Sequence, residues 1–526
     1  MATGVQVTRA LNQVVILGGG TAGWLTAATL AAEHGASLDI TLVESPDIPI
    51  IGVGEGTWPS MRTTLQKIGI SEKALLKECD ATFKQGTEFI GWRSERDAHS
   101  YYHPFSLPAE YASLNLAEHW LASNVTSDFC SSVTAQAGVI NACRAPKALG
   151  VPEFAFQFNY GYHFDAAKLS QLLREHAVKA LGVTHLLANL IGVERSASGA
   201  ITALTLDSSA ALKGDLFVDC SGQRGLLIGE AMGVPMKSMS HVLPNDRAVA
   251  TQVPYSDADA QIASVTRSTA QASGWVWDIG LQSRRGVGYV HSSAHISEDE
   301  AVSSVLDYVK HSDDGVDVGQ LDVRVIPFNA ARREKAWVKN CVAIGLAAGF
   351  IEPLEASSIA LIEQAANRLC QILPLDADNY EAEASAFNDQ MGRQWSQVEE
   401  FLQLHYVLSQ RSDSAYWRDI RSEECVLPEL REKLKKWRRH PIWHTDAPRF
   451  DELFPSASYQ YVLYGMAGRY VSPQTHRQSF QSVRDRADSA MHNVRERSNA
   501  VRSLPGNREL LKALLANTNG ALESVA

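Results

Sequence analysis

The sequence lacks the features of a membrane-spanning, metal-binding or disulfide-linked protein. No apolar run reaches the roughly 20 residues that span a bilayer. The seven cysteines are scattered, with an odd total and no C-x-x-C pair, so neither a zinc site nor a disulfide framework is predicted. The first apolar run, residues 14–17, flows directly into glycines and is typical of a strand, not of a signal peptide. We therefore expect a protein of the reducing cytoplasm, with no bound metal and no membrane partner.

Basic residues are also in short supply. Lys and Arg total 48 against 59 Asp and Glu, which gives a net charge of −11 at pH 7. Because phosphate backbones favour basic surfaces, nucleic acid is not expected as a partner.

A chain of 526 residues is too long for one ordinary hydrophobic core and indicates two domains or one large interwoven unit.

A glycine-rich turn follows the first predicted strand. In Gly18-x-Gly20-x-x-Gly23 the first glycine permits the tight turn, the second lets a pyrophosphate approach, and the third allows close helix packing. A helical pattern over 21–33 begins in this turn, and its N-terminus favours an anion. A second strand, 38–43, ends at Glu44, which is placed to accept hydrogen bonds from a ribose. The turn by itself does not choose between FAD and NAD.

A later glycine-rich segment favours FAD. Gly345-Leu346-Ala-Ala-Gly349 follows a predicted strand, where two-segment FAD proteins bring a second backbone loop to the flavin. Ordinary flavin hydroxylases usually have Gly-Asp here, so Leu346 weakens the interpretation as a plain monooxygenase. Gly52-Val-Gly54-Glu55-Gly56 is a further turn of this kind.

Four other segments carry candidate chemistry. Trp275 and Trp277 alternate on a predicted strand and so share one face, a pattern that core packing also explains in part. Pro353 and the serines after it predict a helix start near Ser357, whose free N–H groups could hold an anion. The segments are Phe83-Lys84, Tyr102-His103-Pro104-Phe105, Gly274-Trp-Val-Trp-Asp-Ile-Gly280 and Glu352-Pro-Leu-Glu355-Ala-Ser-Ser-Ile359.

Taken in chain order, these segments resemble the flavin-dependent tryptophan halogenase family. The family signatures are a G-x-G-x-x-G-W start, a Phe-Lys pair, Y-H-P-F, W-x-W-x-I-P and the octad E-P-L-E-S-T-G-I. The resemblance runs from Val14 to about Ser472. The chain departs from the pattern at Gly280, where the family has Pro, and at Ala356 and Ser358, where it has Ser and Gly.

The resemblance implies an α/β fold. We expect a FAD-binding, flavin-monooxygenase-like module with a GxGxxG Rossmann-type turn over 1–370. An insertion at about 75–155 and a mainly helical C-terminal region, 371–526, are expected to complete the substrate pocket.

The resemblance also implies roles for individual residues. Lys84 positions or captures hypohalous acid, as an ammonium or as a neutral amine that forms a haloamine, and Glu355 polarises the electrophile or takes the ring proton. The other implied roles are halide binding (Ser357, Ser358), a wall on the flavin side (Trp275, Trp277), the substrate pocket (His103, Phe105, Tyr459, Tyr461) and cofactor binding (Gly18, Gly20, Thr21, Ala22, Gly23, Glu44, Gly52, Gly54, Glu55, Leu346, Gly349, Ile359).

The implied reaction needs two small reagents and a partner enzyme. Reduced FAD, supplied by a separate NADH-dependent flavin reductase, and O₂ oxidise a halide ion to hypohalous acid, which then halogenates a small arene. Free tryptophan, indole and a carrier-bound pyrrole or phenol are all conceivable, and we expect indole or a simple derivative. The alternatives are an aromatic flavin monooxygenase, an NADH-consuming flavin reductase or dehydrogenase, and a non-catalytic FAD-binding protein. The sequence leaves a homodimer open.

Overall fold

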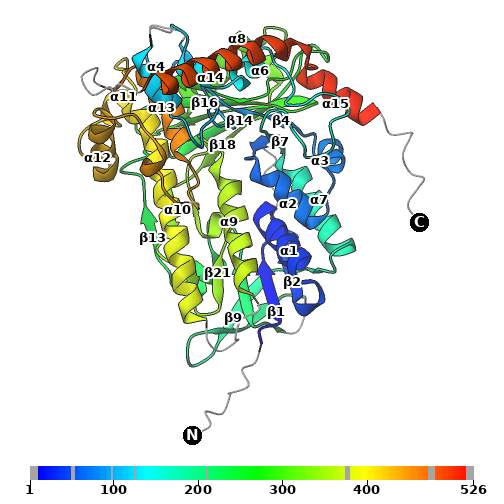
Figure 1. Cartoon of the computed structure of the whole chain (residues 1–526). Coiled ribbons are helices and arrows are strands. Elements are labelled where there is room, and N and C mark those ends of the chain that lie inside the picture. The colour runs from blue at the N-terminus through cyan, green and yellow to red at the C-terminus, as the bar shows by residue number, and fades with distance from the viewer. Residues whose placement is uncertain are drawn as a thin grey trace.

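The computed structural model describes residues 10–48, 54–95, 99–123, 126–208, 211–373, 380–449, 451–471 and 480–516. Within them, a mostly parallel sheet lies in the lower half of the molecule in Figure 1 and a larger, mostly antiparallel sheet in the upper half. All seven cysteines are free thiols. No helix in the described ranges has both the length and the apolar character that crossing a bilayer requires.

The parallel sheet carries the glycine-rich turn. Its order is β20 (Trp337–Val338), β21 (Cys341–Ala343), β12 (Leu216–Asp219), β1 (Gln13–Leu17), β2 (Asp39–Glu44) and β8 (Thr184–Leu187), with only β20 antiparallel. Helix α1 (Thr21–His34) packs on β1 and β2, and α7 (Ala166–Lys179) and α9 (Ser357–Ile372) both pack on α1. Four consecutive residues of β1 are buried, which explains the unbroken apolar run. The predicted strand–helix–strand unit is confirmed, with each boundary within one residue.

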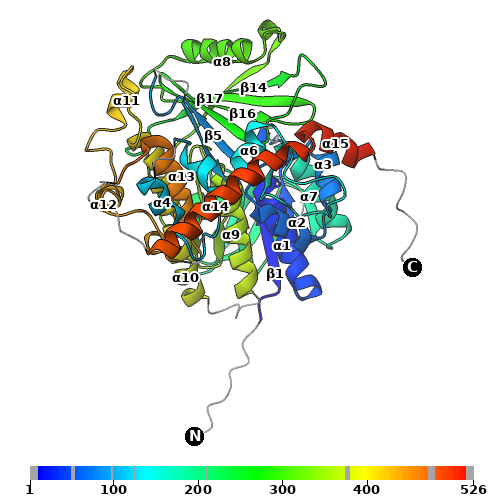
Figure 2. The same ribbon diagram turned by 45° about the horizontal axis from the view of Figure 1, so that its top comes forward.

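The larger sheet has seven strands. Its order is β18 (Val323–Pro327), β14 (Arg247–Pro254), β17 (Arg284–His291), β16 (Gly274–Gly280), β15 (Thr266–Gln271), β5 (Gly86–Ile90) and β6 (Ser100–Pro104). Helix α8 (Glu298–Ser312) covers one face, where Val305 and Val309 pack on β14 and β17 (Figure 2). Within the segment 75–155, strands β5 and β6 form one edge of this sheet.

A small sheet joins the two halves. Its order is β3 (Gly54–Gly56), β7 (Gly161–Asp165) and β4 (Thr82–Lys84), all antiparallel. In this register Gly56 and Thr82 both lie opposite His163. Lys84 is thereby fixed on a strand, close to the backbone of β3.

The remaining sheets and the helices before α9 are short. The strands are β9 (Leu190–Arg195), β10 (Ile201–Leu206), β11 (Leu212–Lys213), β13 (Met236–Ser238), β19 (Ala331–Arg333) and β22 (Gly349–Phe350). The helices are α2 (Ser60–Ile68), α3 (Glu72–Glu78), α4 (Leu116–Ala122), α5 (Phe129–Val133) and α6 (Gln136–Asn141), with a 3₁₀ turn, η4, over Gly345–Ala347.

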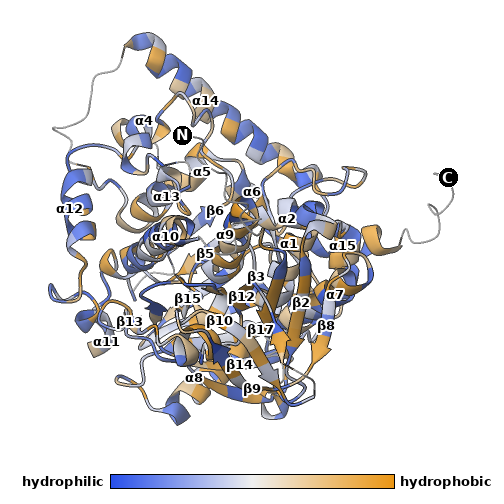
Figure 3. Cartoon of the chain, turned by 90° about the horizontal axis from the view of Figure 1, so that it is seen from below, coloured by the Kyte–Doolittle hydropathy of each residue, from blue (hydrophilic) through white to orange (hydrophobic). Residues whose placement is uncertain are grey.

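Helices dominate the chain after α9. They are α10 (Glu381–Val407), α11 (Ala415–Asp419), α12 (Pro428–Trp437), α13 (Ser456–Ala467), α14 (Gln481–Ala500) and α15 (Asn507–Ala516). Helix α14 is hydrophilic along most of its length and buries only one narrow stripe (Figure 3). The boundary expected at residue 370 falls inside α9, which continues to Ile372.

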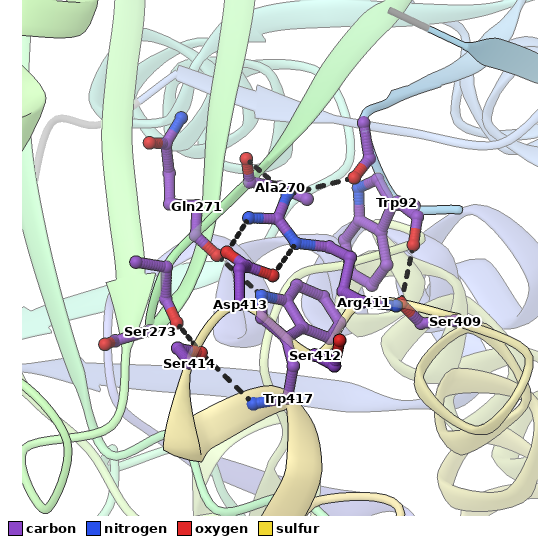
Figure 4. Close-up of polar contacts among 12 residues, drawn as sticks. Trp92, Ala270, Gln271, Ser273, Ser409, Arg411, Ser412, Asp413, Ser414 and Trp417 are labelled. Carbon is purple, nitrogen blue, oxygen red and sulfur yellow. Dashed lines mark hydrogen bonds and ion pairs between the residues drawn. The ribbon is translucent and has the colours of Figure 1, made fainter. Parts of the chain in front are cut away.

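The chain after α10 is fastened to the larger sheet by a buried arginine (Figure 4). The Arg411 guanidinium donates to the Gly91 carbonyl at 3.0 Å and pairs with Asp413 at 2.7 Å. The Ser409 hydroxyl donates to the Trp92 carbonyl at 2.7 Å, and the Trp417 indole N–H donates to Gln271 at 2.8 Å. These bonds hold the C-terminal end of α10 against β5 and β15.

A buried ion pair holds α3 to the segment before β7. Lys147 Nζ lies 2.5 Å from Glu72 Oε2, and both side chains are 2% exposed. The Tyr162 hydroxyl donates to the other carboxylate oxygen at 2.7 Å. We expect Lys147→Met to lower the free energy of unfolding by about 3–5 kcal/mol, because Glu72 would keep a buried charge without its cation.

Thermal and urea unfolding of the two proteins measure this effect. Lys179→Met is the matched control, because its ion pair with Glu175 is exposed and should leave the melting temperature almost unchanged. Equal melting temperatures for wild type and Lys147→Met would contradict the prediction.

Candidate functional site

The glycine-rich turn has three positions with different steric demands. Gly18 has φ of +120°, and a Cβ there would lie 2.2 Å from the Cys220 carbonyl oxygen. A Cβ on Gly23 would lie 1.9 Å from the Gly18 oxygen, so this glycine is needed for the close helix contact. A Cβ on Gly20 would meet nothing within 4 Å. That open space at the N-terminus of α1 fits a bound pyrophosphate.

These differences predict different outcomes for two alanine variants. Gly23→Ala should lower the free energy of unfolding by at least about 1–3 kcal/mol, because its methyl group overlaps the turn. Gly20→Ala should fold normally and bind FAD more weakly, because its methyl group occupies the open space. Melting temperatures and FAD titrations measure the two effects. Tight FAD binding by Gly20→Ala would show that the pyrophosphate lies elsewhere.

Three of the residues predicted to bind the cofactor lie around this turn. The Glu44 carboxylate lies against Gly19 and 2.8 Å from His185 Nε2, at the end of β2. The Thr21 hydroxyl lies 2.9 Å from that of Ser170 on α7. A Cβ on Gly345 would lie 2.6 Å from the Ala22 Cβ, so the glycine-rich turn and η4 are adjacent.

The other predicted cofactor residues differ in their surroundings. Leu346 on η4 is 42% exposed, whereas Ile359 is buried inside α9. A Cβ on Gly349 would lie 2.8 Å from the Ala331 carbonyl oxygen, so its small size is required for the pairing of β19 with β22. Burial and nearby Asp165 raise the pKa of Glu55 to about 7. Gly52 lies outside the described residues.

A cavity of about 110 Å³ lies between β3 and the larger sheet. Gly54, Trp277 and Arg284 line it, with other residues of β14, β17 and β18. Arg284 pairs with Asp165 at 2.7 Å, and its Nη1 is buried without a hydrogen-bond partner among the described residues. Trp275 is fully buried and packs on Trp277 at 6.4 Å between ring centres, so only Trp277 reaches the cavity.

Lys84 lies at the opposite end of β3 from this cavity. A Cβ on Gly56 would lie 2.9 Å from Lys84 Nζ, while Gly54 lines the cavity. The lysine is 1% exposed, and its Nζ lies 5.5 Å from the centre of the Phe105 ring. Burial lowers the pKa of Lys84 to about 8, partly offset by the Glu355 carboxylate. Both protonation states are therefore accessible near neutral pH.

Glu355 is buried between two histidines. Its Oε1 lies 2.9 Å from His103 Nδ1 and 3.1 Å from His405 Nε2. Burial by itself raises the pKa of this carboxyl group, but His103 and His405 outweigh burial and lower the pKa to about 2. Glu355 is therefore a carboxylate, and it is the charge that acts on Lys84.

The start of α9 lies immediately after Glu355. Ser357 is the first helical residue, as the sequence predicts, and Ala356 before it has φ of +53°. The Ser357 hydroxyl is buried without a hydrogen-bond partner in the described part of the chain, whereas Ser358 is partly exposed. An unsatisfied hydroxyl at a helix N-terminus is suited to an anion.

The structure separates the two tyrosines predicted for the substrate pocket. The Tyr461 ring lies 6.2 Å from that of His103, and its hydroxyl donates to Ser106. The Tyr459 hydroxyl instead donates to Glu400 at 3.2 Å and lines a different cavity. Tyr459 is therefore not brought to His103, because positions i and i+2 of a helix face different sides.

Three residues that contact Glu355 or His103 are not among the residues predicted for the site. His405 from α10 contacts the Glu355 carboxylate, and the Ser458 hydroxyl lies 2.9 Å from His103 Nε2. The Trp58 indole N–H donates to the Glu355 carbonyl at 2.8 Å. A lone histidine on a helix and a serine in a helical first turn have no distinctive pattern, so no motif could have identified them.

Comparison with known proteins identifies the family. The family model described as tryptophan halogenase matches residues 13–485. The chain belongs to the tryptophan halogenase family. It is a flavin-dependent halogenase, and the α/β fold and the family predicted from the sequence are confirmed.

Individual relatives cover nearly the whole chain. Tryptophan 6-halogenase SttH from Streptomyces toxytricini is 33% identical over 91% of this chain and 96% of its own. The crystal structure of a tryptophan halogenase from Shewanella frigidimarina NCIMB 400 has a TM-score of 0.93 and 43% identity, covering 97% of this chain and 98% of its own. Tar14, a tryptophan C-6 flavin-dependent halogenase from taromycin biosynthesis, has a TM-score of 0.88 and 32% identity over 96% and 99%.

Proposed function

We propose that this enzyme halogenates indole or a simple indole derivative, with Lys84 and Glu355 as its catalytic residues. The observation that carries the proposal is the enclosure of an amine and a carboxylate together beside aromatic rings. Lys84 is 1% exposed and lies near Phe105, while Glu355 is 4% exposed and bonded to His103. Charged groups are rarely buried without a functional or structural partner.

The cofactor would be held by the glycine-rich turn, with its pyrophosphate at Gly20 and its ribose at Glu44. Its ring would lie in the cavity that Gly54 and Trp277 line. A halide ion would lie at the start of α9, where the Ser357 hydroxyl is unsatisfied and Ser358 follows. When bound, reduced FAD would supply two electrons that reduce one oxygen atom of O₂ to water, while the other oxygen atom oxidises the halide to hypohalous acid.

Lys84 would receive that oxidant. The cavity and Lys84 Nζ are at opposite ends of the three-residue strand β3, so the arene and the cofactor are kept apart. As an ammonium, Lys84 would donate a hydrogen bond to hypohalous acid, and as an amine it would form a haloamine. Enclosure by protein favours selectivity, because hypohalous acid that escaped into water would react with any nucleophile.

Glu355 would act on the arene. An indole ring stacked near His103 and Phe105 acquires positive charge when the halogen adds, and the adjacent carboxylate stabilises that charge or removes the ring proton. The other oxygen, Oε2, would be available for this, because both histidines contact Oε1. If the substrate were tryptophan or a carrier-bound arene instead of indole, its amino acid or carrier groups would extend beyond this aromatic pocket.

Isotope-resolved mass spectrometry tests the proposal. The protein would be incubated with FAD, an NADH-dependent flavin reductase, NADH and a panel of indoles and tryptophan, in chloride or in bromide. We expect the isotope pattern of a mono-halogenated indole, dependent on the reductase. A product that gains oxygen would instead establish the aromatic monooxygenase. Oxidation of NADH without the reductase would establish a flavin reductase or dehydrogenase.

A further inference from the structure

His405 is a fully buried histidine to which the proposed mechanism gives no role. It lies in the last turn of α10, which ends at Val407. Its ring lies 4.6 Å from the ring of Phe89, 5.3 Å from that of Phe401 and 6.1 Å from that of Trp92. Within this aromatic enclosure, its two nitrogens each make one polar contact.

The first contact fixes one proton. His405 Nδ1 lies 2.9 Å from the Phe401 carbonyl oxygen, one helical turn earlier. A backbone carbonyl only accepts hydrogen bonds. Nδ1 is therefore the donor and carries a hydrogen.

The second contact then decides the charge. His405 Nε2 lies 3.1 Å from Glu355 Oε1, which also accepts from His103 Nδ1. His103 can be neutral, because its Nε2 can accept from the Ser458 hydroxyl. With Nδ1 already a donor, His405 either donates from Nε2 as an imidazolium or accepts from a protonated Glu355.

Three features of the geometry favour the imidazolium. The oxygen Oε1 contacts both ring nitrogens, and it can accept from both when it carries no hydrogen, as in the carboxylate. The Phe89, Trp92 and Phe401 rings surround His405, and aromatic faces stabilise a cation. The C-terminal turn of a helix also favours positive charge.

We propose that His405 is an imidazolium that keeps Glu355 ionised and fixes the direction of its second oxygen, Oε2. His405 is thus a positioning residue, since it acts on the arene only through Glu355. The inference rests on the halogenation proposed above for its functional consequence, but the charge on His405 can be measured without it.

Other titratable groups face this cluster and are shared by every variant. The Glu355 charge acts on both Lys84 on β4 and Tyr101 on β6 and favours the protonated form of each. Burial is the larger cause for Tyr101 and raises its pKa well above the usual value, so Tyr101 stays neutral. Glu352, three residues before Glu355, bonds to Tyr406 and Asn245, and burial raises its pKa to about 7. Glu352 shows what burial does to a carboxyl group that has no cation beside it.

The charge on His405 can be measured by NMR. With ¹⁵N-labelled histidine rings, the His405 signals are identified by their loss in His405→Gln. Both nitrogens should have imidazolium chemical shifts at pH 6 and at pH 8, and in Glu355→Gln at least one should become a neutral imidazole nitrogen. A neutral His405 in the wild type at either pH overturns the proposal, whether or not the enzyme halogenates indole.

The pH dependence of turnover tests the function of the charge. The folded pKa of Glu355 is lowered to about 2, so its carboxylate is present above that pH and is lost only as the pH falls through it. In His405→Gln the cation is gone while an amide N–H remains, and the acid limb of kcat should move to a higher pH than in the wild type. Turnover should recover above that limb, and FAD affinity should not change.

A matched control separates this effect from a structural one. His311 on α8 makes the same contact to the carbonyl one turn earlier, 2.6 Å to Asp307, and lies in an exposed position. His311→Gln should keep the wild-type profile. An acid limb in His405→Gln that coincides with that of the wild type, or a turnover that is low at every pH, overturns the role of the charge. Wild type without any halogenated product would instead refute the proposed function.

Discussion

Replacement of Lys84 by alanine should lower the formation of halogenated arene by about 10³-fold, the scale of losing a positioned acid–base or nucleophilic group. The side chain is 1% exposed, and removing its amine takes away the group proposed to hold the oxidant beside the substrate. FAD affinity and halide-dependent formation of hypohalous acid should persist, because the glycine-rich turn and the start of α9 are untouched. A soluble β-diketone added as a trap should then be halogenated by the escaping oxidant.

Two controls accompany this variant. Lys77→Ala removes a lysine whose side chain is 61% exposed on α3 and should leave turnover unchanged. Lys84→Met keeps most of the buried volume and should be as inactive as Lys84→Ala. Regioselective product formed by either Lys84 variant at the wild-type rate would remove Lys84 from the mechanism.

The pKa of Lys84 also sets a direction for the pH dependence. Burial lowers it to about 8, so the ammonium predominates below that pH and the amine above it. If the amine forms a haloamine, single-turnover halogenation rises as the pH increases through 8. If the ammonium donates a hydrogen bond to hypohalous acid, the rate falls over the same range.

Glu355→Gln is the second substitution with a large expected effect, a loss of about 10²- to 10⁴-fold in kcat. The amide keeps the shape of the side chain but loses the negative charge that would stabilise the halogenated ring or take its proton. It also leaves His405 without a counter-ion. Rapid-quench measurements with indole, at saturating halide, would give the loss in the chemical step.

Glu363→Gln is the matched control for this substitution. Glu363 is a buried carboxyl group on α9, and burial raises its pKa to about 7. It accepts a hydrogen bond from the Ser60 hydroxyl on α2 and has no contact with His103 or His405 among the described residues. Its substitution should change stability more than turnover. Equal kcat values for wild type and Glu355→Gln would reduce Glu355 to a structural residue.

Local sequence patterns predicted the parts of the site that lie within one element. The turn at Gly18, Gly20 and Gly23 needs only a strand and a helix that follow one another, so its geometry follows from spacing. The helix start at Ser357 follows from Pro353 and the serines, and α9 begins there. Both features depend on backbone sterics over fewer than ten residues.

Contacts between distant elements could not be predicted in this way. The segment 75–155 has an irregular pattern, yet β5 pairs in parallel with β15, about 180 residues later in the chain. Tyr459 and Tyr461 are close in sequence but have different hydrogen-bond partners, Glu400 and Ser106, because residues two apart on α13 face different sides of the helix. The sequence around His405 has no distinctive motif, and its role depends on a contact with Glu355, 50 residues away in the chain.

By itself, the sequence determined the strand–turn–helix unit at Gly18–Gly23, the start of α9 and the family. It also identified Lys84 and Glu355 as the candidate catalytic residues. Each of these follows from short-range spacing or from motifs in order along the chain. Only the tertiary structure decided which side chains share an enclosure, that Trp277 and not Trp275 reaches the cavity, and that two histidines contact the Glu355 carboxylate. The physical reason is that burial and charge pairing are properties of elements packed together, and they set the pKa values on which the chemistry depends.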